Sequence, residues 1–232
     1  MMLYHTMVTN IIINESNVFR VSENHKVHTE LYDDIQVLVV DNFYENPDLV
    51  KELASIIPAT NHTTRESYPA ATINVSYNMM PVVESYRYYI QTYFPNCLSD
   101  DYIVGIMSQS SFMLNVMQSD GKEYLPPHID CPSEVNLASS VYLNTPEECS
   151  GGTAFFKNEE LMTLLKQPYL NEGEEDKILG FFKDIYKDDY VGCVEIKYNR
   201  MVLYHQNVQH APFMDYNSFV GDNYRINQMF FI

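Results

Sequence analysis

The sequence predicts one mainly β domain, an all-β barrel or sandwich that carries helices in its N-terminal part (α+β). Length favours a single domain, because 232 residues suffice for one substantial core and are few for two. The order of elements favours the class, because two segments with helical spacing of apolar residues precede many short segments of strand composition. We therefore expect one domain over residues 1–232, with a supporting part at 1–100 and a β core at 101–232.

The supporting part contains one predicted strand and two predicted helices. Residues 35–40 are rich in β-branched side chains, which is typical of a strand. Asn46 and Pro47 then combine a capping residue with proline at the first helical position, and Pro58 ends the apolar spacing that follows. A second helix is predicted from about residue 81 to 94, and its stripe of tyrosine, valine and isoleucine side chains indicates core packing.

The predicted β core consists of short strands separated by turn-forming residues. Seven segments have strand composition: 102–107, 111–117, 136–143, 153–156, 193–197, 201–204 and 226–232. An acidic stretch at 159–189 interrupts them and has helical character. We interpret residues 159–190 as an insertion between two strands, which either covers a site as a lid or forms a solvated surface loop.

Charge and cysteine content restrict the kinds of partner and the cellular compartment that we expect. The chain has 14 basic and 31 acidic side chains, and its net charge of −17 argues against nucleic acid and against anionic membranes. This balance fits a neutral or cationic partner, although solubility alone also accounts for it. The four cysteines form no C-x-x-C pair, the N-terminus has no basic segment typical of a signal peptide, and no apolar run approaches the roughly 20 residues that span a bilayer. We expect a cytoplasmic protein with reduced thiols, and the sequence does not indicate its oligomeric state.

A metal site is suggested by His128-Ile129-Asp130, an H-x-D element. On an extended backbone, residues i and i+2 point to the same face, so the imidazole and the carboxylate can bind one ion. With a histidine from a distant strand they would form a two-histidine, one-carboxylate facial triad, which leaves open positions on iron(II). Alone, the element is weak evidence in a chain with seven histidines.

An anion site is suggested by Arg225, which lies in a strand-like run near the C-terminus. A guanidinium holds a carboxylate through two parallel hydrogen bonds, a geometry that lysine does not reproduce. The plainer reading of Arg225 by itself is a surface residue or a structural ion pair.

From residue 102 to residue 232 the chain resembles the prolyl-4-hydroxylase-like branch of the iron(II)- and 2-oxoglutarate-dependent dioxygenases. That branch carries, in order, H-x-D, a Y-L-N strand, G-G-x-x-F, an N-R-apolar-x-F/Y strand, a distal histidine and R-x-S/T. The matching segments are His128-Ile129-Asp130, Tyr142-Leu143-Asn144, Gly151-Gly152-Thr153-Ala154-Phe155, Asn199-Arg200-Met201-Val202-Leu203-Tyr204, His210 and Arg225-Ile226-Asn227. The segment around Asn46-Pro47 also resembles the lead-in of some poorly characterised bacterial members.

The resemblance implies a double-stranded β-helix (jelly roll, cupin-like) with a metal inside its open end. It implies that His128, Asp130 and His210 bind Fe(II), while His205 is a rival for the distal ligand. Arg225 would bind the distal carboxylate of 2-oxoglutarate, and Tyr142 would donate its hydroxyl to the same group.

One position departs from the motif, because Asn227 stands where the branch prefers serine or threonine. An amide can still donate a hydrogen bond to the co-substrate. We therefore keep Asn227 among the expected co-substrate ligands.

The implied activity is hydroxylation, or a related oxidation, of an unactivated C–H bond with O2 and release of succinate and CO2. Asp130 favours this outcome over halogenation, because related halogenases lack the carboxylate so that halide can bind iron. The substrate would be a small molecule, an amino acid or a peptidyl residue. Two alternatives remain open: a non-catalytic β-barrel that binds a metal or ligand, and a zinc hydrolase, for which no H-E-x-x-H-like context supplies a base.

Overall fold

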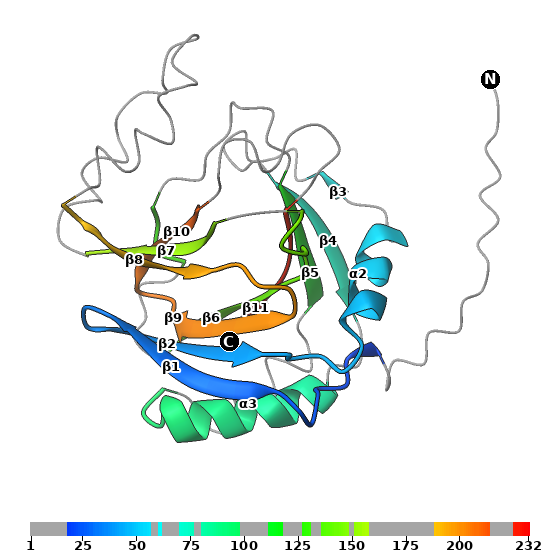
Figure 1. The fold of residues 1–232 in the computed structure, drawn as a ribbon, viewed down its shortest axis with the longest axis horizontal. Helices are drawn as coiled ribbons and strands as arrows, with labels where there is room; N and C mark the ends of the chain where they lie inside the picture. Colours follow the sequence, from blue (N-terminus) through cyan, green and yellow to red (C-terminus); the bar gives the residue numbers. More distant parts are fainter. Residues whose placement is uncertain are drawn as a thin grey trace, which may run out of the picture.

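The structure is a computed structural model that describes residues 18–56, 60–61, 70–76, 80–97, 111–117, 127–130, 136–148, 151–157, 188–213 and 225–232. Two antiparallel sheets face each other, and helices lie outside the larger one (Figure 1). The larger sheet has the order β1-β2-β9-β6-β11-β5-β4-β3, and the smaller has the order β10-β7-β8. In the larger sheet the strands are β1 (Lys26–Tyr32), β2 (Ile35–Asp41), β3 (Thr60–Asn61), β4 (Ala70–Ser76), β5 (Ser111–Met117), β6 (Leu137–Tyr142), β9 (Arg200–His205) and β11 (Arg225–Phe231). In the smaller sheet they are β7 (Gly152–Phe156), β8 (Tyr190–Glu195) and β10 (Gln209–Phe213).

The order in which the chain visits the two sheets defines the fold. From β5 onward it passes to residues 127–130, then to β6, to β7 and β8, to β9, to β10 and finally to β11. Residues 127–130 adjoin the smaller sheet, because His128 forms an antiparallel bridge with His210 of β10. The chain therefore alternates between the two sheets, with β5, β6, β9 and β11 in the larger one and residues 127–130, β7, β8 and β10 on the smaller side, which is the path of a jelly roll. This confirms the predicted double-stranded β-helix core.

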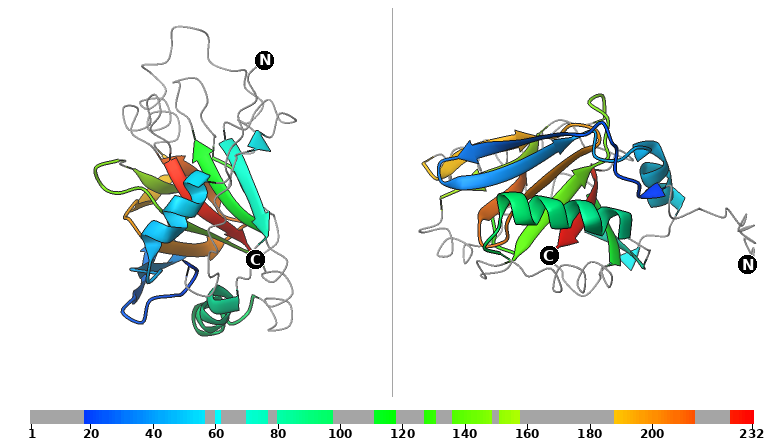
Figure 2. Two further views of the ribbon diagram at one scale, coloured as in Figure 1. Left: turned by 90° about the vertical axis from the view of Figure 1, so that its right-hand side faces the viewer. Right: turned by 90° about the horizontal axis from the view of Figure 1, so that it is seen from below.

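Helix α3 (Met80–Tyr93) covers the outer face of the larger sheet, and the right-hand view of Figure 2 shows it lying across the strands. Its buried stripe of Val82, Val83, Tyr86, Tyr89 and Ile90 belongs to one apolar cluster with the outward side chains of β2, β6, β9 and β11. The Tyr86 hydroxyl lies 2.6 Å from Ser139 Oγ of β6, so its polar end is satisfied inside that cluster. Helix α2 (Pro47–Ile56) contributes Val50, Leu53 and Ala54 to the same cluster.

A second apolar cluster fills the space between the sheets. Side chains alternate along each strand, so β6 sends Leu137 outward to α3 and Ala138 inward, and β9 sends Leu203 outward and Tyr204 inward. The inward cluster contains Val37, Val39, Ala138, Tyr142, Phe155, Val194, Val202 and Tyr204. This interior is the place where the sequence predicts the site.

The two helices and the strand at 35–40 lie where the sequence predicts them. Strand β1 was not predicted, because it is an edge strand whose sequence KVHTELY is polar and half exposed, and only its pairing with β2 makes it a strand. Strand β10 was missed because it contains Pro212, and β4 was also missed. The predicted strand at 102–107 and almost all of the insertion at 159–190 fall outside the described residues. Neither described helix is long and apolar enough to cross a membrane.

Candidate functional site

The structure brings His128, Asp130 and His210 together. Two backbone hydrogen bonds join the histidines, from His128 N to His210 O (2.9 Å) and from His210 N to His128 O (3.0 Å). The Asp130 carboxylate lies between their rings, with Oδ1 3.4 Å from His128 Nε2 and Oδ2 3.3 Å from His210 Nε2. One potential ligand atom from each residue lies within 4.8 Å of the others.

The carboxylate of the group is held in its ionised form. Burial alone would raise the pKa of Asp130, but hydrogen bonds and charge from His128 and His210 lower that pKa well below its usual range. His210 Nδ1 lies 2.9 Å from the Val208 carbonyl oxygen, which accepts a hydrogen bond from the protonated nitrogen. Nε2, which faces the Asp130 carboxylate, is then the nitrogen that could bind a metal, as in most metal-bound histidines.

The donor set fits a divalent transition metal with open coordination positions. Two imidazole nitrogens and one carboxylate oxygen are the donors of the facial triad typical of non-haem iron(II). The His210 side chain is 6% exposed, whereas those of His128 and Asp130 are 25% and 16% exposed. The group is therefore buried at His210 on β10 and accessible to solvent at His128 and Asp130.

His205 lies elsewhere. It ends β9, and its ring packs edge-on against Phe94 at a centroid distance of 5.3 Å, with both ring nitrogens 3.9 Å from Cys97 Sγ. The histidine that the structure brings to His128 and Asp130 is thus His210.

Arg225 is buried at the start of β11, with 1% of its surface exposed. Its Nη2 donates to the Gly152 carbonyl oxygen at 3.0 Å, and its guanidinium carbon lies 5.8 Å from the centre of the Tyr142 ring. A buried guanidinium can bind a carboxylate through two parallel hydrogen bonds, so this position suits an incoming carboxylate.

Tyr142 presents a protonated hydroxyl beside Arg225. Burial raises the pKa of Tyr142 to about 12, with the nearby Arg225 charge opposing the rise. The hydroxyl lies 2.7 Å from Thr153 Oγ1, a contact from β6 to β7 across the interior. If Thr153 donates to the Tyr142 oxygen, the phenolic proton remains available to a ligand. Thr153 was not predicted as a site residue, because its place beside Tyr142 depends on how the two sheets face each other.

An aromatic cluster connects the two parts of the site. The Tyr204 ring contacts His210 (5.0 Å between centroids) and Phe155 (5.1 Å). Tyr204, Phe155 and Tyr142 all belong to the apolar cluster between the sheets. The His128/Asp130/His210 group and Arg225 therefore border the same largely apolar interior, in which electrostatic interactions are stronger than in water.

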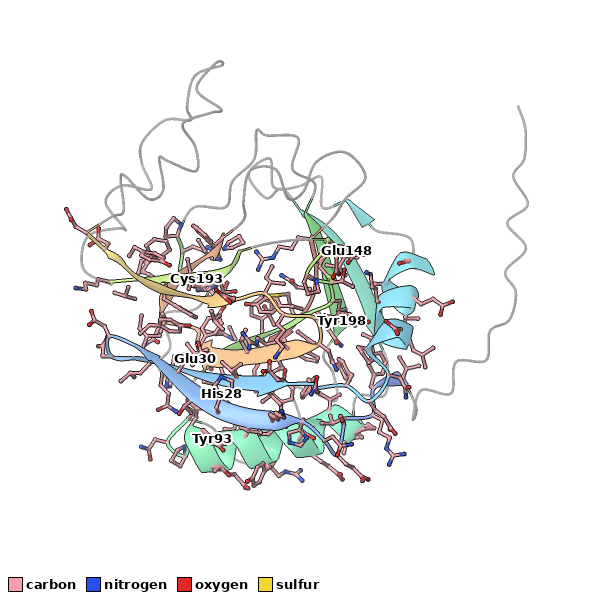
Figure 3. All side chains as sticks on the ribbon, in the orientation of Figure 1. His28, Glu30, Tyr93, Glu148, Cys193 and Tyr198 are labelled. Atoms are coloured by element: carbon pink, nitrogen blue, oxygen red, sulfur yellow. The ribbon has the colours of Figure 1, made fainter. Side chains whose placement is uncertain are left out.

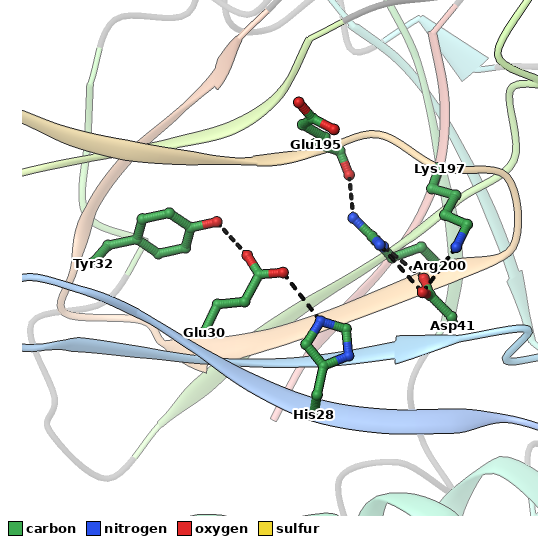
Figure 4. Close-up of polar contacts among 7 residues, drawn as sticks. All are labelled: His28, Glu30, Tyr32, Asp41, Glu195, Lys197 and Arg200. Carbon is green, nitrogen blue, oxygen red and sulfur yellow. Dashed lines mark hydrogen bonds and ion pairs between the residues drawn. The ribbon is translucent and has the colours of Figure 1, made fainter.

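Several motif residues have structural roles instead. Asn199, in a left-handed conformation (φ 61°), binds the Tyr44 backbone with both amide atoms, at 2.8 Å each. Arg200 binds the Asp41 carboxylate and, at 3.1 Å, the Glu195 carbonyl oxygen, which links β9 to β2 and β8 (Figure 4).

A chain of polar contacts runs along β1, the edge strand of the larger sheet that contacts β8, an edge strand of the smaller sheet. Figure 4 shows the contacts of Glu30 with His28 and with Tyr32 on β1. In Figure 3 Glu30 and His28 of β1 are labelled below Cys193 of β8. The Tyr32 ring of β1 also packs on Phe155 of β7 at 5.3 Å between centroids, so this end of β1 covers the inward cluster.

These observations define a class: a double-stranded β-helix protein with a two-histidine, one-carboxylate group and a buried arginine in its interior. The chain belongs to the family described as "Family of unknown function (DUF6445)", which matches residues 23–225. No curated protein matches it at a significant level.

Solved structures resemble the chain distantly. HygX from Streptomyces hygroscopicus, solved with nickel and 2-oxoglutarate bound, is 8% identical, with a TM-score of 0.47 over 84% of this chain and 81% of that one. SnoN, a non-haem α-ketoglutarate-dependent epimerase from nogalamycin biosynthesis, is 12% identical, with a TM-score of 0.39 over 81% and 70%. EvdMO1 is 9% identical, with a TM-score of 0.33 over 91% and 55%. The fold assigned above follows from the strand order of this chain.

Proposed function

We propose that the protein is an iron(II)- and 2-oxoglutarate-dependent oxygenase of the prolyl-4-hydroxylase-like branch. The observation that carries the proposal is the convergence of His128, Asp130 and His210 within 4.8 Å at the interior that buries Arg225. A metal-binding barrel or a zinc hydrolase would need the three ligands alone. The buried arginine is explained by a co-substrate that carries a second carboxylate.

In this proposal the residues divide into two groups. His128, Asp130 and His210 hold iron(II), and Arg225 and Tyr142 hold the distal carboxylate of 2-oxoglutarate. When bound, iron and 2-oxoglutarate would activate O2, which would hydroxylate a C–H bond of the substrate while 2-oxoglutarate is converted to succinate and CO2. Because Asp130 fills a ligand position that a halogenase leaves to halide, the expected outcome is hydroxylation or a related oxidation.

The protein's own groups prepare the site before any ligand arrives. The Val208 carbonyl oxygen binds His210 Nδ1, so that Nε2 faces Asp130, and contacts from the two histidines favour the ionised form of Asp130. Thr153 orients the Tyr142 hydroxyl, and burial keeps that hydroxyl protonated. Fixed dipoles of this kind need no reorganisation during the reaction.

The substrate class follows less directly from the chain. Because the chain has a net charge of −17, we propose that its substrate is a neutral or cationic small molecule, amino acid or peptidyl residue. We propose neither nucleic acid nor a membrane as a partner. A cytoplasmic location, which would keep the metal and the thiols reduced, belongs to the same proposal.

The test is an anaerobic titration of metal-free protein with iron(II) and 2-oxoglutarate, followed by the weak visible charge-transfer band of the chelate. The wild type should form the band, His128→Ala should lose it, and Arg225→Ala should need far more 2-oxoglutarate. His205→Ala is the matched control and should behave as wild type, since His205 contacts Phe94 and Cys97 instead. A protein that binds metal but never forms the band would be the non-catalytic barrel.

A further inference from the structure

Asn227 lies two residues after Arg225 on β11, so both side chains point to the interior. Asn227 is 5% exposed and Arg225 is 1% exposed. In the register of β11 with β6, Asn227 stands opposite Tyr142. The three residues therefore form one buried group on two neighbouring strands.

The amide of Asn227 is engaged on both of its atoms. In the orientation that satisfies both, its Nδ2 donates to the Ile226 carbonyl oxygen at 3.1 Å and its Oδ1 accepts from Arg225 Nε at 3.3 Å. The Asn227 nitrogen is thus directed at the backbone, and the oxygen is directed at the arginine.

Arg225 is consequently held at two points of its guanidinium. Asn227 holds the Nε edge, the Gly152 carbonyl oxygen holds Nη2 at 3.0 Å, and the Tyr142 ring lies beneath at 5.8 Å. Arginine has a long side chain with several rotatable bonds, and binding a carboxylate in the two-pronged geometry requires the planar group to be fixed. Fixing it beforehand removes that entropy cost from the binding step.

We propose that Asn227 is a positioning residue that orients Arg225 for a carboxylate ligand, and that it does not itself bind the co-substrate. This inference rests on the proposed function, since it assigns how the co-substrate end of that site is built. It differs from the expectation drawn from the sequence, in which Asn227 replaces a serine or threonine donor. Residue 227 would then act on the co-substrate carboxylate indirectly, by orienting Arg225.

The first measurement concerns the ligand-free protein. In a ¹H–¹⁵N spectrum of arginine-labelled protein, assigned with Arg225→Lys, the Arg225 Nε–H signal should be shifted and protected from exchange. Asn227→Ala should abolish that protection. Asn227→Asp keeps an acceptor oxygen at the same place and should retain it, which guards against a variant that merely folds poorly. Protection that persists in Asn227→Ala, or disappears in Asn227→Asp, would overturn the inference.

The second measurement is calorimetric binding of 2-oxoglutarate to the protein loaded with zinc. Asn227→Ala should raise the dissociation constant about tenfold while zinc affinity stays within twofold. Gln228→Leu is the matched control: Gln228 is the next residue, is buried on the opposite face of β11 and accepts from the Tyr44 hydroxyl at 2.6 Å. It should lower stability without changing 2-oxoglutarate affinity.

The two measurements separate two kinds of failure. If Asn227→Ala binds 2-oxoglutarate as wild type does, the positioning role is wrong and the proposed function stands. If the wild type does not bind 2-oxoglutarate at all, the proposed function fails and takes this inference with it, whatever the arginine spectrum shows.

Discussion

Gly152→Ala should destabilise the protein more than a single methyl group normally does. A Cβ at this position would lie 1.9 Å from the Val194 carbonyl oxygen and 2.9 Å from Cys193 Sγ. Non-bonded heavy atoms need about 3.5 Å, so β7 and β8 would have to separate locally by about 1.5 Å. The obstacle is backbone that a rotamer change cannot move, so we expect the upper end of the cost of overpacking, about 3 kcal/mol.

Thermal unfolding measures this cost. For a domain of this size each kcal/mol shifts the midpoint by about 2–4 °C, so Gly152→Ala should melt about 6–12 °C below wild type. Ala154→Gly, two residues along the same strand, is the control and should cost only about 1 kcal/mol. Because the Gly152 carbonyl oxygen accepts from Arg225, Gly152→Ala should also weaken 2-oxoglutarate binding at unchanged metal affinity. A melting point within about 3 °C of wild type would refute the reasoning.

Substitutions at three further positions test other parts of the structure. Burial alone would raise the pKa of Asp41, but hydrogen bonds from Arg200 and a neighbouring lysine lower it from 3.8 to about 2. The stabilisation from that ion pair is therefore present above pH 3.8 and is lost as pH falls toward 2. Asp41→Asn should lower the free energy of unfolding, measured in urea, by about 2 kcal/mol at pH 7 and by about half as much at pH 3. A cost that does not change with pH would contradict this. Asn199→Ala should lower the free energy of unfolding by about 3 kcal/mol, because it removes two hydrogen bonds to Tyr44 and places alanine in a left-handed conformation. Asn199→Gly removes the same hydrogen bonds without that strain and should lower it clearly less. Equal urea midpoints for the two variants would show that strain is unimportant. Tyr142→Phe should weaken 2-oxoglutarate binding about tenfold in the chelate titration, and an unchanged affinity would remove the hydroxyl from the site.

The sequence predicts those parts of the fold that depend on local patterns. The helix after Pro47 and the helix over 81–94 are marked by capping residues and apolar spacing, and both are present. The alternation of strands in the second half also predicts a β sandwich or barrel. Strand β1 escapes prediction, because its exposed polar residues become a strand only through pairing with β2.

The candidate site is predictable only to the extent that its residues lie in short motifs. Strand geometry predicts His128 and Asp130 of H-x-D on one face, and the motif resemblance favours His210 over His205, whereas the contact among the three depends on the pairing of residue 128 with β10. The Tyr142–Thr153 contact and the Asn227–Arg225 contact likewise depend on register and on the facing of sheets. Neither contact leaves a periodic signal along the chain.

The most direct measurement is an anaerobic crystal structure of the protein with iron(II) and 2-oxoglutarate, with anomalous data collected at the iron edge. The account predicts one strong peak bound by His128 Nε2, the Asp130 carboxylate and His210 Nε2, and a 2-oxoglutarate whose distal carboxylate meets Arg225. An iron peak elsewhere, or a 2-oxoglutarate that does not reach Arg225, would contradict it.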